Sequence, residues 1–428
     1  MDRFVIRGGV PLNGRVRPAG NKNSAFPLIS AALLTDEPVT LHNLPAIGDV
    51  ETMLAIIADL GASIARLGPH SVTIEARNLN KTQPDPTLFG SIRGALVLMG
   101  SLLAREGQIE LTRPGGDQIG RRRIDTHILA LEALGAEFRA QPTFRLDAGK
   151  LVGASILLDE ASVTATENAL MAAATATGRT VIRNAASEPH VQQLCHLLNA
   201  MGARIQQVGS DTLIIDGVDA LGGAEFSLDV DYLEVVSFIG AAAATGGSVR
   251  LEGSASDHLA MPRLVFGRMG VQWDDDGDDI VVPAGQRLAI TPDLDGHIPK
   301  IDDGPWPAFP ADLMSIAIVL ATQARGTVLF HEKMFESRLF FVDKLIGMGA
   351  QIVLCDPHRC IVQGPSALQA EPQGIASPDI RAGMSLLLAA LCAEGTTTIS
   401  NIGQIDRGYE QVEEKLRVLG ADIERIED

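Results

Sequence analysis

Hydrophobic and polar positions along the chain repeat in a fixed order. Apolar residues at helical spacing, as over residues 50–60, lead to a glycine, and alternating apolar and polar positions follow it. This order recurs six times at intervals of about 70 residues, so the repeat covers the whole chain. Glycine at the end of a helix adopts the left-handed conformation without steric cost. We therefore predict six units of helix, glycine cap and strand, with caps at Gly61, Gly135, Gly202, Gly270, Gly349 and Gly420.

Each unit also contains a second helix that is apolar on all sides, which is typical of a helix in a protein interior. Its many small residues allow several such helices to pack closely around one axis. These predicted helices span residues 28–34, 95–106, 168–177, 235–245, 312–325 and 383–394. Helices that alternate with strands predict the α/β class. The six units divide most simply into two domains of three, with a crossover at residues 226–231 and a hinge that would close over a ligand.

Composition narrows the classes of function. The 428 residues exceed the size of a single hydrophobic core, which agrees with two domains. A net charge of −18 argues against a general nucleic-acid or acidic-membrane surface but allows one local cationic pocket. We find no apolar signal segment and no run of 18 apolar residues, and we expect the four cysteines as reduced thiols. The sequence therefore predicts a cytoplasmic protein without membrane insertion.

Metal-binding patterns are weak in this chain. Cys355 and Cys360 flank a turn, and because no second ligand cluster accompanies them, we expect a hairpin between two strands there. His127, His190 and His358 have no metal-ligand spacing relative to one another. We expect neither a metal nor an organic cofactor.

Two segments have the chemistry of an anion site. Lys22 and Asn23 precede a buried helix, where their side chains would add donors to the free backbone N–H groups. The alternative there is a helix cap with a solvated lysine. Residues 113–123 combine four arginines with three glycines, so that mobile backbone would carry fixed positive charge for a phosphate or carboxylate. The alternative is a basic surface turn, although such a cluster is unusual in so acidic a chain.

Carboxylates and arginines recur at corresponding places of the later units. Asp312 follows rigid prolines at the start of a buried helix, and Asp379 has the same place before the next one. Each is either a cap favoured by the helix dipole or a positioned base. Arg338 and Arg407 follow strands at equivalent points of their units. This repetition favours a catalytic role for Asp312 and Asp379, without excluding that they are only helix caps.

Several motifs together resemble the UDP-N-acetylglucosamine 1-carboxyvinyltransferases, enolpyruvyl transferases of peptidoglycan synthesis. The motifs are Gly20-Asn21-Lys22-Asn23, Pro114-Gly115-Gly116 with Ile119-Gly120 and Arg122, Ser162-Val163 with residues 165–168, Ala308-Phe309-Pro310 with Asp312, and residues 405–409. The likeness extends over essentially the whole chain, and Asn-Lys-Asn fits this family better than the related 5-enolpyruvylshikimate-3-phosphate synthases.

The resemblance implies a two-domain inverse α/β barrel, built of six βαβαββ-type units with three per domain around a pseudo-threefold axis. One domain would span residues 22–229 and carry the mobile loop 113–123. The other would combine residues 1–21 with residues 230–428, and the active site would lie in the cleft between the two. The oligomeric state stays open.

The implied reaction transfers the enolpyruvyl group of phosphoenolpyruvate to the 3′-hydroxyl of UDP-N-acetylglucosamine and releases phosphate, without a cofactor. It is the first committed step of peptidoglycan synthesis. The residues implied to bind phosphoenolpyruvate are Lys22, Arg93, Arg122, Arg338, Arg381 and Arg407. Those implied to bind the UDP-sugar are Asn23, Arg93, Arg122, Arg123, Asp125, Ser162, Val163, Asp312 and Met334. The implied catalytic residues are Asp117, Lys22, Asp312 and Arg407, with Asp379 as a further candidate base.

The sequence departs from the family pattern in the mobile loop. Most members carry, at the position of Asp117, a cysteine that protonates the substrate methylene and is alkylated by fosfomycin. A carboxylic acid with a raised pKa can deliver that proton, but a carboxylate is a poor nucleophile toward an epoxide. We therefore expect an active enzyme that resists fosfomycin.

Other departures concern the acceptor. They are Arg123, Thr126, Thr164, Tyr232 and Val236, together with Ser187 and His190. Arg123, Thr126 and Thr164 are expected to face the nucleotide, whereas the cations for phosphoenolpyruvate are retained. Two alternatives consequently stay open: enolpyruvyl transfer to another nucleotide or nucleotide sugar in a secondary pathway, and a catalytically silent nucleotide-sugar binding homologue. The retained cations and carboxylates argue against the second alternative.

Overall fold

The computed structural model describes residues 2–116, 120–141 and 143–427. Within these ranges the chain divides into two compact units. One, here called the terminal unit, combines the residues before Gly20 with those from Val230 onward, and the other, the central unit, holds the described residues of 20–116 and 122–229. The Asp231 N–H donates to Ala19 O in the terminal unit, and the Asn21 N–H donates to Asp229 O in the central unit. The two crossing segments therefore run side by side.

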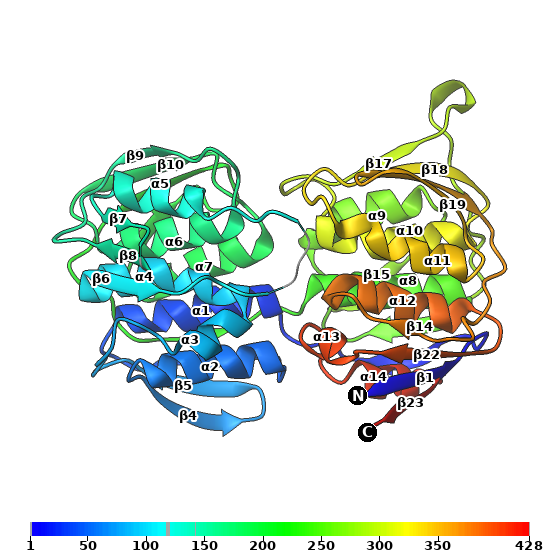
Figure 1. Cartoon of the computed structure of the whole chain (residues 1–428), viewed down its shortest axis with the longest axis horizontal. Helices are drawn as coiled ribbons and strands as arrows, with labels where there is room; N and C mark the ends of the chain where they lie inside the picture. Colours follow the sequence, from blue (N-terminus) through cyan, green and yellow to red (C-terminus); the bar gives the residue numbers. More distant parts are fainter. Residues whose placement is uncertain (1, 117–119, 142, 428) are drawn as a thin grey trace. The chain divides into compact units, whose positions relative to one another are not determined.

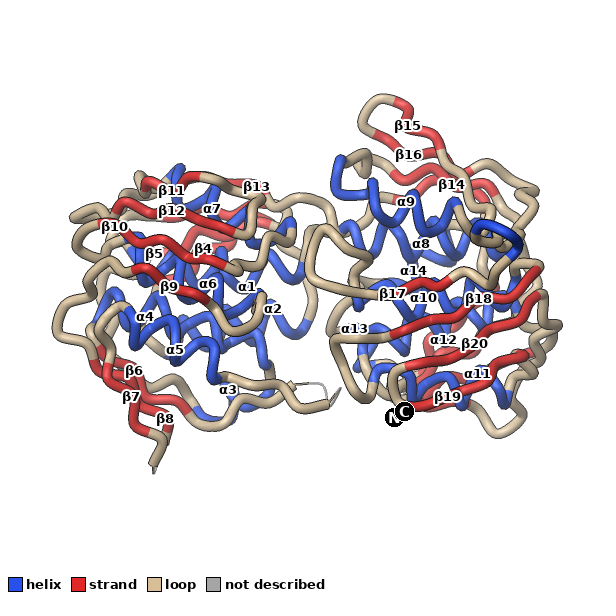
Figure 2. The backbone as a smooth tube through the Cα atoms, turned by 90° about the horizontal axis from the view of Figure 1, so that it is seen from above, coloured by secondary structure: helices blue, strands red, loops and turns tan. Residues whose placement is uncertain are grey.

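Three buried helices form the interior of the central unit, and strands lie around them (Figures 1 and 2). The inner helices are α1 (Lys22–Ala31), α4 (Leu98–Glu106) and α6 (Val163–Ala174). The outer helices are α2 (Gly48–Asp59), α5 (Asp125–Ala133) and α7 (Pro189–Ala200), and a short helix α3 (Pro86–Ser91) precedes α4. In order, the sheets are β13 (Ala224–Ser227), β3 (Val39–His42), β5 (Ser71–Glu75) and β4 (Ser63–Gly68); β9 (Ser155–Leu157), β10 (Arg179–Arg183), β12 (Thr212–Asp216) and β11 (Arg204–Gln206); and β6 (Gln108–Leu111), β8 (Phe144–Asp147) and β7 (Glu137–Arg139).

The terminal unit repeats this plan around α8 (Tyr232–Thr245), α10 (Ala311–Gln323) and α12 (Ile380–Cys392), which contact one another pairwise. The remaining helices are α9 (Ala260–Gly267), α11 (Val342–Gly347), α13 (Gly403–Asp406) and α14 (Val412–Val418). In order, its sheets are β2 (Asn13–Val16), β14 (Ser248–Leu251), β16 (Asp279–Val282) and β15 (Asp274–Asp276); β17 (Lys300–Asp302), β18 (Gly326–His331), β20 (Arg359–Gly364) and β19 (Gln351–Asp356); and β21 (Ile375–Ala376), β22 (Thr396–Ser400), β1 (Arg3–Arg7) and β23 (Asp422–Ile426).

The four-stranded sheets share one pattern of pairing. A parallel pair such as β17 and β18 is extended by an antiparallel hairpin such as β20 and β19. The sheets that contain β9 and β17 run in chain order as strand, inner helix, strand, outer helix and two strands, so the predicted βαβαββ-type unit is confirmed. In the other four-stranded sheets a strand from a distant segment takes one of these places, namely β13 beside β3, β2 beside β14, and β1 between β22 and β23. The sheet of β6, β8 and β7 lacks the parallel edge strand among the described residues. At that edge the Glu110 N–H instead donates to the main-chain oxygen of Thr82.

The predicted glycine caps are confirmed, because all six glycines have φ between 87° and 109°. After five of them the next strand begins two residues later, whereas β15 begins four residues after Gly270. The alternating apolar and polar residues after Gly270 predicted that this strand begins earlier, and that prediction is wrong. The side chain of Gln286 accepts from the Gln272 N–H at 2.6 Å and donates to Gln272 O at 2.9 Å, so it occupies the backbone groups that a neighbouring strand would need.

Five inner helices begin one to six residues before their predicted starts, whereas α4 begins three residues after its own. Side chains cap four of the early starts. Ser162 accepts from Ala165 N–H before α6, Asp231 accepts from Leu233 N–H before α8, and Asp379 accepts from Ala382 N–H before α12. Such caps satisfy backbone donors that have no partner within the helix. The hairpin expected at Cys355 and Cys360 is confirmed, since they lie on the paired strands β19 and β20.

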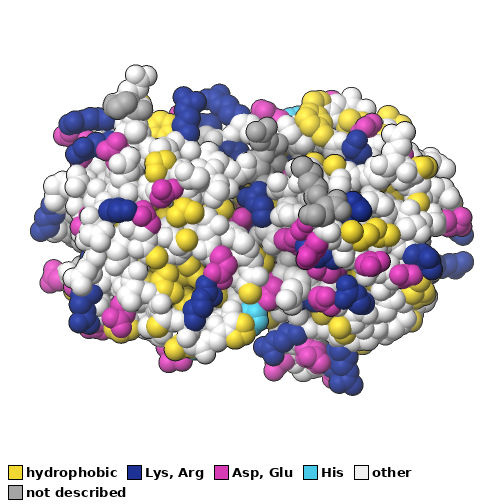
Figure 3. Space-filling view, turned by 60° about the horizontal axis from the view of Figure 1, so that its bottom comes forward, with side chains coloured by type: hydrophobic (Ala, Val, Ile, Leu, Met, Phe, Trp, Pro, Cys, Tyr) yellow, Lys and Arg dark blue, Asp and Glu magenta, His cyan; other side chains and the backbone are white. Residues whose placement is uncertain are grey.

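On the face drawn in Figure 3, acidic and basic side chains are interspersed, and hydrophobic side chains gather in small patches. This mixture agrees with the acidic net charge and with the absence of an extended basic surface on that face. Among the described residues, the helices are all too short or too polar to cross a bilayer.

Replacement of Gly202 by alanine tests the role of the caps. Gly202 has φ +102° and open space where a Cβ would lie, so the variant suffers backbone strain without a clash. We expect a loss of about 1–2 kcal/mol in the free energy of unfolding, measured by urea denaturation. Gly267→Ala is the matched control, because Gly267 also has open space but ends helix α9 without a positive φ. That variant should be neutral or slightly more stable. Equal losses in both variants would contradict the assignment.

Candidate functional site

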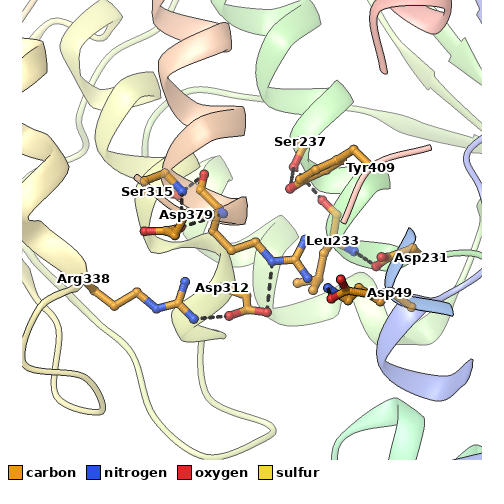
Figure 4. A network of polar contacts seen from close by, with 12 residues as sticks. Asp49, Asp231, Leu233, Ser237, Asp312, Ser315, Arg338, Asp379 and Tyr409 are labelled. Atoms are coloured by element: carbon orange, nitrogen blue, oxygen red, sulfur yellow. Dashed lines mark hydrogen bonds and ion pairs between the residues drawn. The ribbon is translucent and has the colours of Figure 1, made fainter. Parts of the chain in front are cut away.

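An acidic side chain in the terminal unit is held by two arginines. Asp312, on the first turn of α10, accepts from Arg338 Nη2 through Oδ1 and from Arg381 Nε through Oδ2, the latter at 3.1 Å (Figure 4). Arg381 lies on the first turn of α12, and Arg338 follows the loop after β18. Three segments that are far apart in the sequence thus converge on one carboxylate.

This charge cluster is largely removed from water. The side chains of Arg381 and Arg338 are only 6% and 11% exposed. Burial by itself raises the pKa of Asp312, but Arg381 and Arg338 outweigh it and hold that pKa below its ordinary value. In the same way, burial lowers the pKa of Arg381, while Asp312 more than offsets that effect and raises it. Asp312 and Arg381 are therefore both charged near neutral pH.

Each of the two arginines also has an N–H donor that no other group of the described chain accepts from. Arg338 Nε and Arg381 Nη1 are buried and have no hydrogen-bond acceptor among the described residues. A buried donor without an acceptor is costly, so such groups usually have a partner. Guanidinium donors suit carboxylate and phosphate oxygens in particular. The pair is therefore suited to bind an anion.

Further polar groups surround Arg381. Its guanidinium lies over the ring of Tyr409, and the hydroxyl of Tyr409 lies 3.2 Å from that of Ser237. Burial raises the pKa of Asp231 to about 6, although Arg381 opposes this shift. The sequence did not single out Asp231 as a site residue. Only its position before a small-residue helix could have marked it, and there it acts as the cap of α8.

Asp379 acts as a helix cap in this structure. Its Oδ1 accepts from the backbone N–H of Arg381 at 2.8 Å and of Ala382 at 2.9 Å. Ser315 reinforces the same turn, since its hydroxyl donates to Arg381 O at 3.1 Å. Asp379 thus orients Arg381 through the backbone. Of the two roles that the sequence left open for Asp379, this favours the helix cap over the base.

Arg407 lies at the end of the short helix α13, where Nη1 donates to Gln404 Oε1 at 2.9 Å. The preceding residue, Asp406, forms a two-bond ion pair with Arg425 on β23. That ion pair ties the Arg407 segment to the C-terminal strand. Met334, in the loop after β18, is 41% exposed.

In the central unit, Lys22 is a buried cation on the first residue of α1. Its Nζ donates to Asp49 Oδ2 at 2.8 Å and lies 5.8 Å from the centre of the Phe26 ring. Asn21 caps the helix by accepting from Ser24 N–H. The solvated-lysine alternative is wrong, since the Lys22 side chain is 8% exposed. Asn23 follows on the same turn of α1.

A second cationic group of the central unit lies at the end of the arginine-rich segment. Arg93 Nη2 donates to the main-chain oxygen of Arg122 at 2.7 Å, and burial lowers the pKa of Arg93. Arg123 donates to Asp125 at 3.3 Å and to Asp159 at 2.8 Å. The structure thus brings Arg93, Arg122 and Arg123 together. The predicted residue Asp117 lies outside the described residues.

Three residues at which the sequence departs from the family pattern, Arg123, Thr126 and Thr164, form hydrogen bonds at or near the starts of α5 and α6. Thr126 donates to Asp159 Oδ1 at 2.6 Å, and Asp159 also binds Arg123. A hydrogen bond of 2.8 Å joins Thr164 to His127 Nε2. Burial, together with Arg93, lowers the pKa of His127 to about 4, so its ring is neutral at physiological pH. Ser162 and Val163, predicted to bind the UDP-sugar, form the cap and first residue of α6 close by in sequence.

Comparisons with known proteins identify the family of the chain. The family model described as EPSP synthase (3-phosphoshikimate 1-carboxyvinyltransferase) matches residues 6–416. The UDP-N-acetylglucosamine 1-carboxyvinyltransferase of Bradyrhizobium diazoefficiens is 54% identical over 99% of this chain and 98% of its own length. The enzyme of the same name from Treponema denticola is 50% identical over 99% of each chain. The chain belongs to the UDP-N-acetylglucosamine 1-carboxyvinyltransferase family.

Solved structures confirm the predicted fold. The enolpyruvyl transferase NikO from Streptomyces tendae is 27% identical, with a TM-score of 0.87 over 99% of this chain and 98% of that one. EPSP synthase from Acinetobacter baumannii is 19% identical and has a TM-score of 0.76 over the full length of both chains. The second likeness concerns the fold alone. The inverse α/β architecture expected of the UDP-N-acetylglucosamine 1-carboxyvinyltransferase family is therefore present.

The contacts in the structure also reveal acids that the sequence analysis missed. Asp49, Asp159 and Asp231 each neutralise or face a cation of the site, but none lies in a motif that the sequence pattern isolated. Their partners are 27, 36 and 150 residues away, so spacing along the chain gave no signal for them. Of these three acids, Asp49 and Asp231 lie at the starts of helices, so a search of helix starts would have included them but not Asp159.

The ion pairs of Asp312 predict a specific dependence of stability on pH. Because the folded-state pKa of Asp312 lies below its ordinary value of 3.8, its contribution is complete above about pH 4 and is lost as the pH falls further. Asp312→Asn should cost about 3 kcal/mol at pH 7, since Arg381 stays buried with its main counterion removed. Urea denaturation should show this difference shrinking below pH 4. Asp343→Asn, an exposed acid on α11, is the control. A difference that is the same at pH 3 and pH 7 would argue against the ion pairs.

Proposed function

We propose that the protein transfers the enolpyruvyl group of phosphoenolpyruvate to the 3′-hydroxyl of UDP-N-acetylglucosamine and releases phosphate, in peptidoglycan synthesis. Full-length identity of 50% and more to curated transferases of that name carries the proposal. The buried arginine donors beside Asp312 support it, because the donor substrate offers both a carboxylate and a phosphate.

Recognition of phosphoenolpyruvate is assigned to the cations of both units. In the terminal unit these are Arg338, Arg381 and Arg407, and in the central unit Lys22, Arg93 and Arg122. Several of them are buried and already paired with a carboxylate or a main-chain oxygen. Fixed charges in a dehydrated site stabilise developing charge far better than mobile charges in water. The phosphate that leaves would be held by the same cations.

Asp312 is proposed as the base that receives the proton of the acceptor hydroxyl. With both arginines on it, Asp312 is a weak base, since its pKa is lowered. An anionic substrate that accepts from the open donors Arg338 Nε and Arg381 Nη1 would offset part of the positive charge that acts on Asp312, and would thereby raise the basicity of Asp312. The base would then become effective only when the donor substrate is bound. Met334 and Asn23 are proposed to contact the acceptor sugar nucleotide.

The acceptor nucleotide is assigned to the central unit, near Arg123, Asp125, Ser162 and Val163. There the chain carries its unusual residues, and Asp159 already binds both Arg123 and Thr126. A phosphate that approached Arg123 would meet a guanidinium with two carboxylates on it. This observation favours, as a second candidate, an acceptor that differs from UDP-N-acetylglucosamine in its nucleotide or diphosphate part.

Phosphate release with a panel of acceptors tests the proposal. Purified protein with phosphoenolpyruvate should release phosphate when UDP-N-acetylglucosamine is added, and much less with UDP-glucose or UDP alone. The physical reason is that the attacking hydroxyl must be held next to Asp312 by the rest of the acceptor. Release only with another nucleotide would support the second candidate. No release with any acceptor would refute enolpyruvyl transfer.

Fosfomycin resistance is expected from the carboxyl group at position 117, which lies outside the described residues. A carboxylate attacks an epoxide far more slowly than a thiolate does. Incubation with fosfomycin should therefore leave activity unchanged over time and give no covalent adduct by mass spectrometry. Asp117→Cys, the matched variant, should become sensitive, and Asp117→Ala should lower kcat by at least about 100-fold while leaving UDP-sugar affinity similar. Time-dependent inactivation of the natural protein would contradict this expectation.

A further inference from the structure

Two carboxyl groups apart from Asp312 share one buried position in the terminal unit. Asp303 and Glu332 are 1% and 0% exposed. Asp303 directly follows β17 and Glu332 directly follows β18, and these strands are parallel neighbours (Figure 1). One backbone group, the Met334 N–H, donates to both Asp303 Oδ2 and Glu332 Oε1, so the two carboxyl groups lie beside each other. Two carboxylates so close in a dry environment cannot both be ionised without a large cost.

The surrounding donors account for all the carboxyl oxygens except one. Asp303 accepts from the backbone N–H groups of Lys333 and Met334. Glu332 Oε1 accepts from the N–H groups of Met334 and Phe335, at 3.3 and 3.1 Å. Glu332 Oε2 is buried and has no donor among the described residues. A proton on this oxygen, donated to Asp303, completes the arrangement and removes the repulsion.

The charged groups on the neighbouring elements are consistent with a proton on the carboxyl group of Glu332. Burial raises its pKa well above the ordinary value, Asp303 raises it further, and Arg338 opposes the shift. Lys333 is nearby, but its Nζ pairs with Asp302, as does that of Lys300. His358, from the turn between β19 and β20, bonds through Nδ1 to the main-chain oxygen of Glu332 rather than to its carboxyl group.

The position of the pair connects it to the site. The chain that leaves Asp303 leads through a loop to Asp312, and the chain that leaves Glu332 leads through another loop to Arg338. Asp312 and Arg338 form an ion pair at the far ends of these loops. The first loop is closed by the Gly304 N–H, which donates to Phe309 O. The two loops are therefore joined twice, once at the strand ends and once at the site.

We propose that Asp303 and Glu332 are positioning residues, which share one proton and thereby hold together the two loops that carry Asp312, Met334 and Arg338. Neither residue touches substrate in this scheme. The inference rests on the proposed function, since it assigns a role to these loops in enolpyruvyl transfer. Loss of the shared proton would place two negative charges at the base of the loops and loosen the Asp312–Arg338 geometry.

The sign of the pH effect follows from the raised pKa of Glu332. The stabilisation by the shared proton is complete below the ordinary value of 4.5 and is lost as the pH rises through the raised folded-state value. Activity should therefore show an alkaline decline. In Glu332→Gln the amide N–H₂ donates to Asp303 at every pH, while its oxygen keeps the bonds from Met334 and Phe335. That variant should lose the part of the decline that Glu332 causes.

The test compares kcat and KM for phosphoenolpyruvate from pH 6 to 10 in the natural protein, Glu332→Gln, Glu332→Ala and the exposed control Asp343→Asn. At pH 7, Glu332→Gln should stay within about threefold of the natural kcat/KM, whereas Glu332→Ala should lose about tenfold or more. The alkaline decline should shift to higher pH in Glu332→Gln and stay unchanged in Asp343→Asn. An unshifted decline in Glu332→Gln, or full activity in Glu332→Ala, would overturn the proposal.

A measurement without substrate separates this inference from the proposed function. Urea denaturation should show that the natural protein loses stability relative to Glu332→Gln as the pH rises from 7 to 10. If the natural protein releases no phosphate with any acceptor, the proposed function fails, while this stability difference still decides whether the proton is shared. Where Glu332→Ala does not fold, Glu332→Gln alone decides. Normal phosphate release with no stability difference would refute the shared proton only.

Discussion

The buried charge of Arg381 is the constraint around which the terminal unit's site is arranged. A guanidinium with so little exposure is tolerated only with a counterion and with partners for its donors. Asp312 supplies the charge, and Tyr409 supplies a ring face. Because Asp312 and Arg381 occupy the first turns of α10 and α12, which pack against each other, the ion pair is fixed by the core itself. The geometry of the charges is therefore as rigid as the helix packing beneath it.

Elsewhere the same problem of buried charge has different solutions. Lys22 is paired with Asp49, so a cation again meets an acid from a neighbouring helix. Asp303 and Glu332 have no cation between them, and a shared proton is the remaining way to bury both. The arginines beside Asp312 keep open donors for an anion, whereas the carboxyl pair offers an anion no positive charge. The arginine cluster therefore suits a binding site, and the carboxyl pair suits a support.

The sequence predicted the repeating features of the fold well, because they depend on local chemistry. A glycine with positive φ and an apolar helix are properties of a few successive residues, and all six caps were found. The start of β15 was missed because the Gln286 side chain reaches back to Gln272. Lys22, Arg338, Arg407 and the arginines of residues 113–123 stood out in the sequence itself, but their roles toward phosphoenolpyruvate came from the family resemblance. Their partners, such as Asp49 for Lys22, were missed because only the folded chain brings them together.

The residues at which the sequence departs from the family pattern near α5 and α6 are linked to one another through shared hydrogen-bond partners. Thr126 and Thr164 looked independent in the sequence, yet both lie beside the first turns of α5 and α6, where Asp159 and His127 hold them. Asp159 also binds Arg123, so an unusual arginine and an unusual threonine share one carboxylate. On the donor side, by contrast, Arg338 and Arg381 keep buried donors open. An anion can bind there without breaking existing bonds to those atoms, whereas a phosphate at Arg123 must first displace an acid. Under the proposed function, the site for phosphoenolpyruvate is therefore pre-organised, and discrimination between acceptors is expected at Arg123, where the acceptor must compete with bound acids.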